Sequence, residues 1–336
     1  MNFVFGPNAS GKSSLIEAIY FLGRARSFRE NNWRSLRRDG QPYVRVLGKL
    51  RRRQKREIRI GVERSDKETR IRIDGRTAQS TKELLNEIPL LLVQPESHRL
   101  LELGPAYRRQ FLDWGVFHVE HRFYPAWQRY RKAWRQRNAV LRESPSDAGL
   151  SPWEQEMDLA ANDLDQQRER YLEKLLPRIR SLGASLLGIG NLTLRYQRGW
   201  PSDENLGVTL RKARQRDSVK GYTHHGPHRA DLTLYIGDQR AASRVSRGQQ
   251  KLLIFSLVLA QAGLLQDNAE DSKPVLLVDD LAAELDPERV ERLVTYIQDA
   301  GMQVFVTGTD RRLFPDQVLQ DGAVFHVEHG KVRAVV

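Results

Sequence analysis

Eight consecutive residues near the start of the chain have the types and spacing of a phosphate-binding loop. Residues 6–13 read Gly-Pro-Asn-Ala-Ser-Gly-Lys-Ser and satisfy the pattern G-x-x-x-x-G-K-[ST]. In this pattern the glycines let backbone N–H groups approach phosphate oxygens, the lysine reaches the β and γ phosphates, and the final hydroxyl can hold Mg²⁺. The sequence therefore predicts that a nucleoside triphosphate is bound by Gly6, Asn8, Ser10, Gly11, Lys12, Ser13 and Ser14.

A pair of carboxylates far along the chain completes this chemistry. The apolar run 274–278 ends in Asp279 and Asp280. Because a phosphate loop needs a carboxylate for its metal ion, we expect Asp279 to bind Mg²⁺ together with Ser13. Asp280 is then the candidate general base or water-orienting group. Lys12 and Asp280 are the predicted catalytic residues.

The segments around these residues predict the elements that position them. The apolar strand 3–5 precedes the loop, and the apolar run 15–22 after it is suited to a helix. Runs 274–278 and 303–307 read as buried strands, and the second ends in small polar residues. Strand, loop and helix in this order are the context that the phosphate-loop pattern requires.

The segment 245–250 reads Val-Ser-Arg-Gly-Gln-Gln and lies directly before the apolar run 251–264. Taken alone, it predicts an ordinary helix start with Ser246 as the N-cap. Together with the phosphate loop and the acidic strand, in this order, it resembles the signature motif of ABC-type ATPases. The resemblance implies an ATP-dependent homodimer in which the signature of one copy closes over ATP held by the other, through Ser246, Arg247, Gly248 and Gln249.

The same resemblance gives Gln94 the Q-loop role of contacting Mg²⁺ or water and places Asp286 in the D-loop. Two positions depart from the ABC pattern. Asp280 stands where most ABC heads have glutamate, and Thr307 begins a Thr-Gly-Thr segment where many have a switch histidine. Both departures are consistent with slow turnover. The loop also starts about one strand earlier than in that class, so we expect a misassigned start or a shortened chain.

Three further segments narrow the resemblance. Residues 23–29 (Gly-Arg-Ala-Arg-Ser-Phe-Arg), 104–113 (Gly-Pro-Ala-Tyr-Arg-Arg-Gln-Phe-Leu-Asp) and 225–231 (His-Gly-Pro-His-Arg-Ala-Asp) are similar to segments of the RecF family. On these and the ATPase motifs, which run from residue 3 to about 310, the chain is identified as a member of that family of bacterial recombinational-repair ATPases.

Membership implies an α/β fold, an ABC-type P-loop ATPase head with an inserted, mainly helical second lobe. It implies the cofactors ATP and Mg²⁺, weak DNA-dependent ATP hydrolysis, and dimerisation on duplex DNA at single-strand gaps. Hydrolysis would release the protein, which would assist loading of RecA with RecR and RecO, in DNA repair, recombination, replication and the SOS response.

The positive charge of the chain is concentrated in one region. The whole chain has 55 Lys+Arg, 42 Asp+Glu and a formal net charge of +13. Residues 24–76 contain 19 Lys+Arg and 7 Asp+Glu, a local excess of +12. Alternating Ile and Arg at 58–60 and 70–73, with a turn signal at 74–75, predict an antiparallel sheet with one arginine face. The face is either a solvated surface or a DNA-binding one, which would comprise Arg24, Arg26, Arg51, Arg52, Arg53, Lys55 and Arg56.

Two segments of opposite charge predict a helical hairpin in the middle of the chain. Residues 122–142 carry seven Lys/Arg and no acid, whereas 154–173 carry seven acids and two arginines. A break at 144–152 separates them, so we expect antiparallel helices with complementary faces. We therefore predict an ATPase head formed by 1–96 and 223–336, including a basic sheet near 43–76, and an inserted helical lobe at 97–222.

Composition excludes several other classes. The chain has no cysteine, so it has no disulfide, thiolate metal site or cysteine nucleophile, in keeping with a cytoplasmic protein. Its longest apolar stretch, 252–265, is shorter than the ~20 residues of a membrane span, and we expect no membrane partner. The repeated tetrapeptide His-Val-Glu-His at 118–121 and 326–329 lacks the spacing of a metal site.

Two alternatives from other classes remain. One is the ATPase subunit of a membrane transporter, which would need a transmembrane partner and a conventional glutamate and histidine. The other is a DNA-binding scaffold that uses ATP only to join two copies and does not hydrolyse it.

Overall fold

The computed structural model describes residues 1–30, 32–51, 57–143, 146–268, 273–281, 285–313, 319 and 322–335. The chain divides into two compact units, one formed by Met1–Ser97 with Lys251–Val336 and the other by His98–Gln250. The two ends of the chain therefore build the first unit together, and the second unit is an insertion between them.

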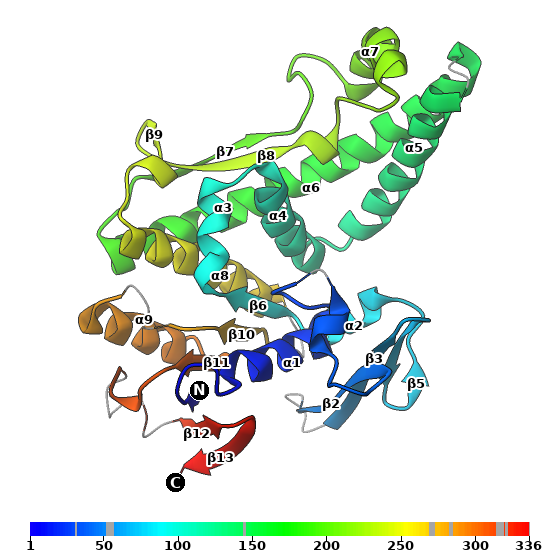
Figure 1. Cartoon of the computed structure of the whole chain (residues 1–336). Coiled ribbons are helices and arrows are strands. Elements are labelled where there is room, and N and C mark those ends of the chain that lie inside the picture. The colour runs from blue at the N-terminus through cyan, green and yellow to red at the C-terminus, as the bar shows by residue number, and fades with distance from the viewer. Residues whose placement is uncertain are drawn as a thin grey trace. The chain divides into compact units, whose positions relative to one another are not determined.

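A six-stranded sheet forms the centre of the first unit (Figure 1). Its order is β13, β12, β1, β11, β10, β6, and the described pairs are parallel except for β12 with β13. Continuous apolar runs such as the Val-Leu-Leu-Val of β10 can be buried on both faces, as inner parallel strands require. The strands are β1 (Asn2–Phe5), β6 (Leu90–Val93), β10 (Val275–Val278), β11 (Gln303–Gly308), β12 (Ala323–Glu328) and β13 (Lys331–Val335).

A smaller antiparallel sheet follows in the same unit, in the order β2 (Tyr43–Arg51), β3 (Glu57–Ser65), β4 (Thr69–Ile73), β5 (Arg76–Thr77). Its apolar side chains alternate with arginines, and the apolar set Ile58, Ile60, Val62, Ile71 and Ile73 is buried. Asp74 and Gly75 have φ 49° and 80°, so both central residues of the turn are left-handed, as in a type I′ hairpin. The predicted sheet with one apolar and one arginine face is confirmed.

Helix α1 (Lys12–Arg24) lies between the two sheets of the first unit, and Figure 1 shows it running from the N-terminal strand toward β2 and β3. Its buried Ile16 and Phe21 belong to one core cluster with Ile60 of the small sheet and Leu277 of the large one. The small sheet is thereby fixed to the element that carries the phosphate-binding loop. A short helix, α2 (Thr81–Glu87), and the 3-10 turn η1 (Trp33–Leu36) complete this region.

The C-terminal part of the chain contains the helices α8 and α9. Helix α8 (Arg247–Asn268) is long and apolar enough to cross a membrane by length and composition alone, but most of it is buried inside the protein, as in a core helix. Helix α9 (Pro287–Asp299) is amphipathic, with Val290, Leu293, Val294 and Ile297 buried.

The second unit is mainly helical. Its helices are α3 (Arg99–Glu102), α4 (Pro105–Val119), α5 (Phe123–Glu143), α6 (Asp147–Leu187) and α7 (Leu206–Lys220), and its strands are β7 (Leu192–Gln197), β8 (Asp231–Ile236) and β9 (Gln239–Arg240). Helices α5 and α6 form the predicted hairpin of opposite charge. Arg129 of α5 pairs with Glu156 and Asp163 of α6, with N–O distances of 2.7 and 3.4 Å.

The predicted break between these helices is too long. Helix α6 begins at Asp147, so Pro152 lies inside it. The helix begins early because the Ser146 side chain accepts a hydrogen bond from the Gly149 N–H at 3.2 Å and caps it.

The second unit also ends later than the lobe predicted from the sequence, at Gln250 rather than at residue 222. Strand β8 pairs with β7 along its whole length, from Asp231 opposite Gln197 to Ile236 opposite Leu192. Two arginines of α4 reinforce this link, because Arg108 binds the Asp231 carboxylate and Arg109 donates to the Ala230 carbonyl. Pairing between strands that are distant in the sequence does not change the local pattern of apolar residues, so the sequence around residue 222 does not show that the second unit continues.

Candidate nucleotide site

The phosphate-binding loop connects β1 to α1, and glycine is required at both ends of it. Gly11 has φ 109°, in the left-handed region. A Cβ atom on Gly6 would lie only 2.1 Å from the carbonyl oxygen of Val327, so β12 permits no side chain there. The turn after β12 also contacts the loop, because the Gly330 N–H donates to the Ser10 carbonyl at 2.9 Å.

Two polar side chains of the loop point to an anionic ligand. The Lys12 ammonium donates to the carbonyl oxygens of Gly6 and Pro7, each at 2.8 Å, so it lies over the loop itself. The Ser10 hydroxyl is buried and has no hydrogen-bond partner within the described part of the chain. Asn8 and Ser14 are exposed. A phosphate would give the exposed N–H groups of the loop and the Ser10 hydroxyl an acceptor.

The strand order brings the predicted carboxylates to this loop. Because β1, β11 and β10 are parallel neighbours, their carboxyl ends lie at one edge of the sheet. Asp279 directly follows β10, and its Oδ1 accepts a hydrogen bond from the Ser13 hydroxyl at 3.1 Å. Asp280 comes next, half-buried, with φ 58° in the left-handed region. A hydroxyl and a carboxylate in contact are oxygen donors of the kind that Mg²⁺ prefers.

A third residue at this edge was noted in the sequence only as replacing a switch histidine, and no contact was predicted for it. The Thr307 hydroxyl, at the end of β11, donates to Asp279 Oδ1 at 2.7 Å and accepts from the Asp280 N–H at 2.9 Å. The Lys251 ammonium, on the opposite side, donates to the Asp280 carbonyl at 2.8 Å. The available sequence signals were weak: a hydroxyl at the end of a buried strand, and one lysine at the start of an apolar helix.

The two residues assigned by likeness to ABC proteins have different surroundings. Gln94 follows β6, whose Val93 is the partner of Val278, so Gln94 and Asp279 leave neighbouring parallel strands together. The Asp286 carboxylate accepts from the Arg289 N–H at 3.0 Å and caps α9. Asp286 therefore has a local structural role, whatever it contacts in addition.

The signature segment forms the start of α8. The Ser246 hydroxyl accepts from the Gln249 N–H at 3.4 Å, and the Gln249 side chain accepts from the Ser246 N–H at 2.9 Å, which is a reciprocal capping box. The N-cap predicted for Ser246 is confirmed. Arg247 pairs with Glu102 at 2.7 Å, and Gly248 is half-buried in the first turn. Ser246 and Arg247 are exposed, so a phosphate could approach this helix N-terminus.

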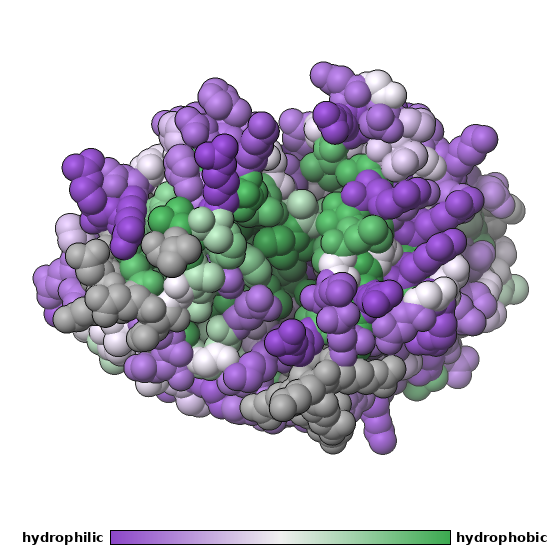
Figure 2. All heavy atoms as spheres, turned by 90° about the horizontal axis from the view of Figure 1, so that it is seen from below, coloured by the Kyte–Doolittle hydropathy of each residue, from purple (hydrophilic) through white to green (hydrophobic). Residues whose placement is uncertain are grey.

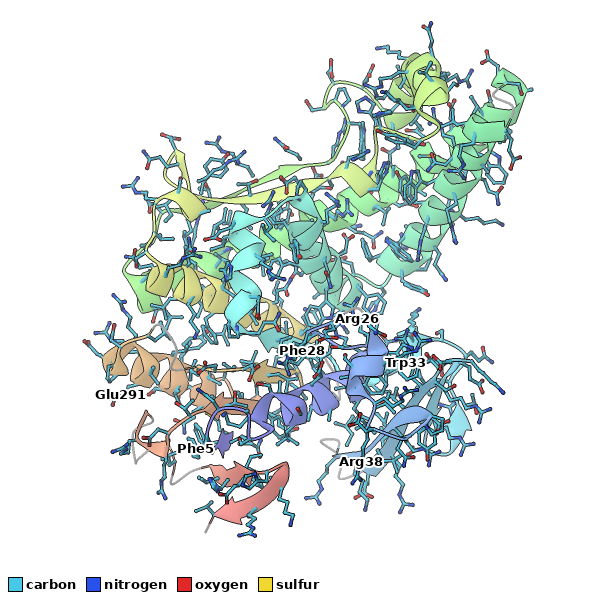
Figure 3. The ribbon with its side chains drawn as sticks, in the orientation of Figure 1. Phe5, Arg26, Phe28, Trp33, Arg38 and Glu291 are labelled. Carbon is cyan, nitrogen blue, oxygen red and sulfur yellow. The ribbon has the colours of Figure 1, made fainter. Side chains whose placement is uncertain are left out.

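The residues predicted to bind DNA differ in exposure. Arg26 is exposed just beyond α1, in the region that Figure 3 labels with Phe28 and Trp33, and Arg51 is exposed at the end of β2. Arg24 is different: it donates to the Leu90 carbonyl at 2.5 Å, and burial lowers its pKa to about 10. This placement argues against a DNA contact by Arg24. Arg52, Arg53, Lys55 and Arg56 lie outside the described residues.

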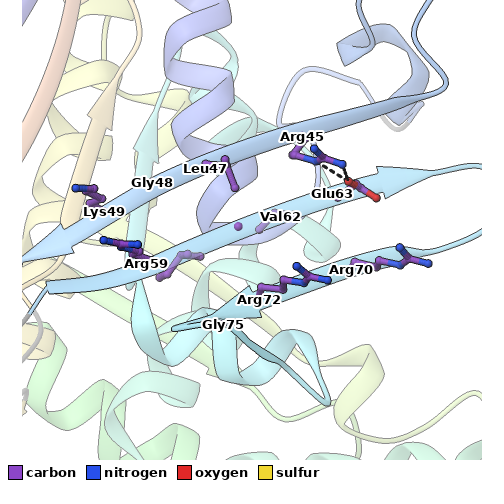
Figure 4. Close-up of a pocket in the computed structure, with 12 residues that line it drawn as sticks. Arg45, Leu47, Gly48, Lys49, Arg59, Val62, Glu63, Arg70, Arg72 and Gly75 are labelled. Carbon is purple, nitrogen blue, oxygen red and sulfur yellow. Dashed lines mark hydrogen bonds and ion pairs between the residues drawn. The ribbon is translucent and has the colours of Figure 1, made fainter.

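The cations on the outer face of the small sheet are partly paired with glutamates. Its outer surface, shown in Figure 4, is lined by Arg45, Lys49, Arg59, Arg70 and Arg72 around the exposed Leu47. Three glutamates pair with these cations, Glu57 with Lys49 and Arg59, Glu63 with Arg45, and Glu68 with Arg70. Four of these five cations therefore have part of their charge balanced by a neighbouring carboxylate. Figure 2 shows one face of the molecule, on which polar side chains surround apolar patches.

Known proteins match this chain over nearly its whole length. The family described as RecF/RecN/SMC N terminal domain matches residues 1–332. A DNA replication and repair protein RecF from Stutzerimonas stutzeri is 43% identical over 99% of this chain and 90% of its own, and one from Azotobacter vinelandii is 42% identical over 99% and 92%.

Solved structures agree as well. A recombination mediator protein RecF bound to ATP has a TM-score of 0.87 and 26% identity over 100% of this chain and 91% of its own. An Smc head domain from Pyrococcus furiosus, with a TM-score of 0.56 and 15% identity over 99% and 89%, shares the fold. The fold and the loop therefore define an ABC-type ATPase head. Within that class, the chain belongs to the RecF family of DNA replication and repair proteins.

Proposed function

We propose that this protein is an ATP-dependent DNA-binding protein of recombinational repair. ATP joins two copies on duplex DNA at single-strand gaps, and slow hydrolysis releases them. The expected partners are RecR, RecO and RecA, and the expected location is the cytoplasm. The observation that carries the proposal is the convergence of the phosphate-binding loop, Ser13 and Asp279 at one sheet edge, in a chain of the RecF family.

The residues at this edge fit ATP with Mg²⁺. Ser13 and Asp279 would hold the metal ion, which when bound neutralises phosphate charge. Lys12 would exchange its two carbonyl acceptors for phosphate oxygens, since both lie on the same loop. Asp280 would orient the hydrolytic water as the catalytic carboxylate, and Gln94 would contact the metal or the water. No group of three or more acidic or histidine side chains in the described residues forms a separate metal centre.

The dimer is expected to place a signature segment over the phosphates of each ATP. Ser246 is exposed at the start of α8 and could contact a γ phosphate of a second copy, as could Gly248 in the first helical turn. Arg247 and Gln249 would flank that contact. Arg26, Arg51 and the basic segment 52–56 would meet the DNA backbone.

Two rivals make different predictions. Family membership favours a repair protein over a transporter subunit. A scaffold that binds ATP without hydrolysing it remains the second candidate, because Asp280 and Thr307 replace the glutamate and histidine of most ABC heads. ATP turnover measured with and without gapped duplex DNA separates the two: DNA-stimulated release of phosphate supports hydrolysis, and no release supports the scaffold.

The test of the proposal is DNA affinity with and without ATP. Lys12→Arg and Asp279→Asn are each expected to abolish the ATP-dependent part of DNA binding. Replacing Arg51, Arg52 and Arg53 by glutamate should lower affinity and flatten its salt dependence by up to ~0.9 log units per lost phosphate contact. Unchanged DNA binding in the triple variant would place the DNA surface elsewhere.

A further inference from the structure

The short segment that carries the proposed water-orienting carboxylate has an unusual backbone. Asp280 has φ 58°, a left-handed conformation that non-glycine residues adopt rarely. A residue keeps such a strained backbone conformation only where the surrounding structure holds it in place. The contacts that hold Asp280 in this conformation are made by its own backbone N–H and carbonyl groups.

Two side chains from different elements bind those peptide groups. On the N–H side, the Thr307 hydroxyl accepts from Asp280 at 2.9 Å. On the carbonyl side, the Lys251 ammonium donates to Asp280 at 2.8 Å. Both residues are buried, with Thr307 only 1% and Lys251 7% exposed. Asp280 is therefore held between β11 and α8, while its own side chain is left half-exposed.

The Thr307 hydroxyl makes one contact more, because it donates its proton to Asp279 Oδ1 at 2.7 Å. One oxygen thus connects the carboxylate that faces Ser13 with the backbone of the next residue. A hydroxyl has one proton to donate and lone pairs to accept, so this double role fits Thr or Ser and no apolar side chain. The backbone bond from the Leu281 N–H to the Thr307 carbonyl, 3.2 Å, does not depend on the side chain at all.

From these contacts we propose that Thr307 and Lys251 are positioning residues for ATP hydrolysis, which set the direction of the Asp280 carboxylate through its backbone. Thr307 does so at the position where many ABC heads have a switch histidine, but it acts on the acidic pair rather than on the γ phosphate. The inference rests on the proposed function, since it presupposes that Asp280 orients the water.

The decisive pair of variants is Thr307→Val and Thr307→Ser. Valine has nearly the shape of threonine but no hydroxyl, whereas serine keeps the hydroxyl and lacks the methyl group. We expect Thr307→Val to lower kcat for ATP hydrolysis by about 10- to 100-fold, the size of effect that a misplacement of about 1 Å produces. KM and the Kd for a slowly hydrolysed ATP analogue should stay within about threefold. Thr307→Ser should restore most of kcat.

A second readout follows the lifetime of the ATP-dependent complex on DNA. If hydrolysis ends that complex, Thr307→Val should prolong it and Thr307→Ser should not. Lys251→Met tests the other contact and is expected to lower kcat in the same way, which keeps the inference testable should Thr307→Val not fold. Circular dichroism and the melting temperature identify such a failure.

The possible outcomes separate the inference from the proposed function. If the wild-type protein hydrolyses ATP and kcat is unchanged in both Thr307→Val and Lys251→Met, the inference is wrong but the proposed function stands. A serine variant as slow as the valine variant would also overturn it, because the methyl packing would then be what matters. No turnover by the wild-type protein would refute hydrolysis itself, and the inference with it.

Discussion

The imidazole of His228 is expected to make the stability of the second unit depend on pH. The ring is partly buried, between the ring of Trp134, with ring centroids 4.8 Å apart, and the hydroxyl of Tyr130. Its Nδ1 accepts from the Tyr130 hydroxyl at 2.6 Å, and its Nε2–H donates to the Thr223 carbonyl at 3.1 Å. This arrangement suits the neutral ring. Burial is the main cause that lowers the pKa of His228 from 6.5 to about 4.

The sign and the size of the effect follow from that pKa. Below pH 6.5 the unfolded chain binds a proton at His228 that the folded chain rejects until about pH 4. The contribution to stability is therefore complete above pH 6.5 and is lost as the pH falls toward 4. At about 1.4 kcal/mol per pKa unit, the full loss is about 3 kcal/mol, most of which is reached by pH ~4.5.

The assay compares the wild-type protein with His228→Gln, which cannot titrate. Urea unfolding followed by tryptophan fluorescence gives the free energy of unfolding at pH 7.5 and pH 4.5. Between these values the wild-type protein should lose about 2 to 3 kcal/mol more than the variant. Other titrating groups, such as His225 with its lowered pKa, occur in both proteins and cancel in the difference. An equal loss in both proteins would refute the lowered pKa of His228.

Two further pairs of substitutions, each a test variant with its control, probe the packing of the insertion and of the site. Arg137 is fully buried between Glu154 and Asp217, and the substitution Arg137→Met should lower the free energy of unfolding by about 3 to 5 kcal/mol. As the control, Arg129→Met at an exposed ion pair should lower it by less than about 1 kcal/mol in the same urea titration. Equal losses would contradict the assigned burial. Gly6→Ala should abolish nucleotide binding in a fluorescence titration, because its Cβ would meet the β12 backbone, while Gly104→Ala, which meets nothing within 4 Å, should bind normally.

The parts of the site that lie on continuous segments could be predicted from the sequence. The phosphate-binding loop is one run of residues whose types fix its conformation, and Asp279 follows a strand recognisable by its apolar run. The capping box of Ser246 and Gln249 has the same local character. The small sheet was predictable because its alternation has the period of a strand.

Features that depend on contacts between distant segments could not be predicted. Arg24 belongs to a basic region by sequence, but the fold brings it to the Leu90 carbonyl. Glu63 pairs with Arg45 because their two strands align in a particular register, and neither strand's sequence alone determines that register. Thr307 and Asp279 are 28 positions apart in the sequence and meet only because β11 lies beside β10 in the sheet. The end of the insertion was misplaced for the same reason, since β8 returns to β7.

The central claim, that ATP joins two copies through the signature segment, is tested most directly by sedimentation velocity with and without ATP. The wild-type chain should sediment as a monomer without nucleotide and as a dimer with ATP. Ser246→Arg should still bind ATP but remain a monomer, because the larger side chain blocks the approach of a second nucleotide to α8. A Ser246→Arg protein that dimerises with ATP as the wild-type protein does would contradict the account.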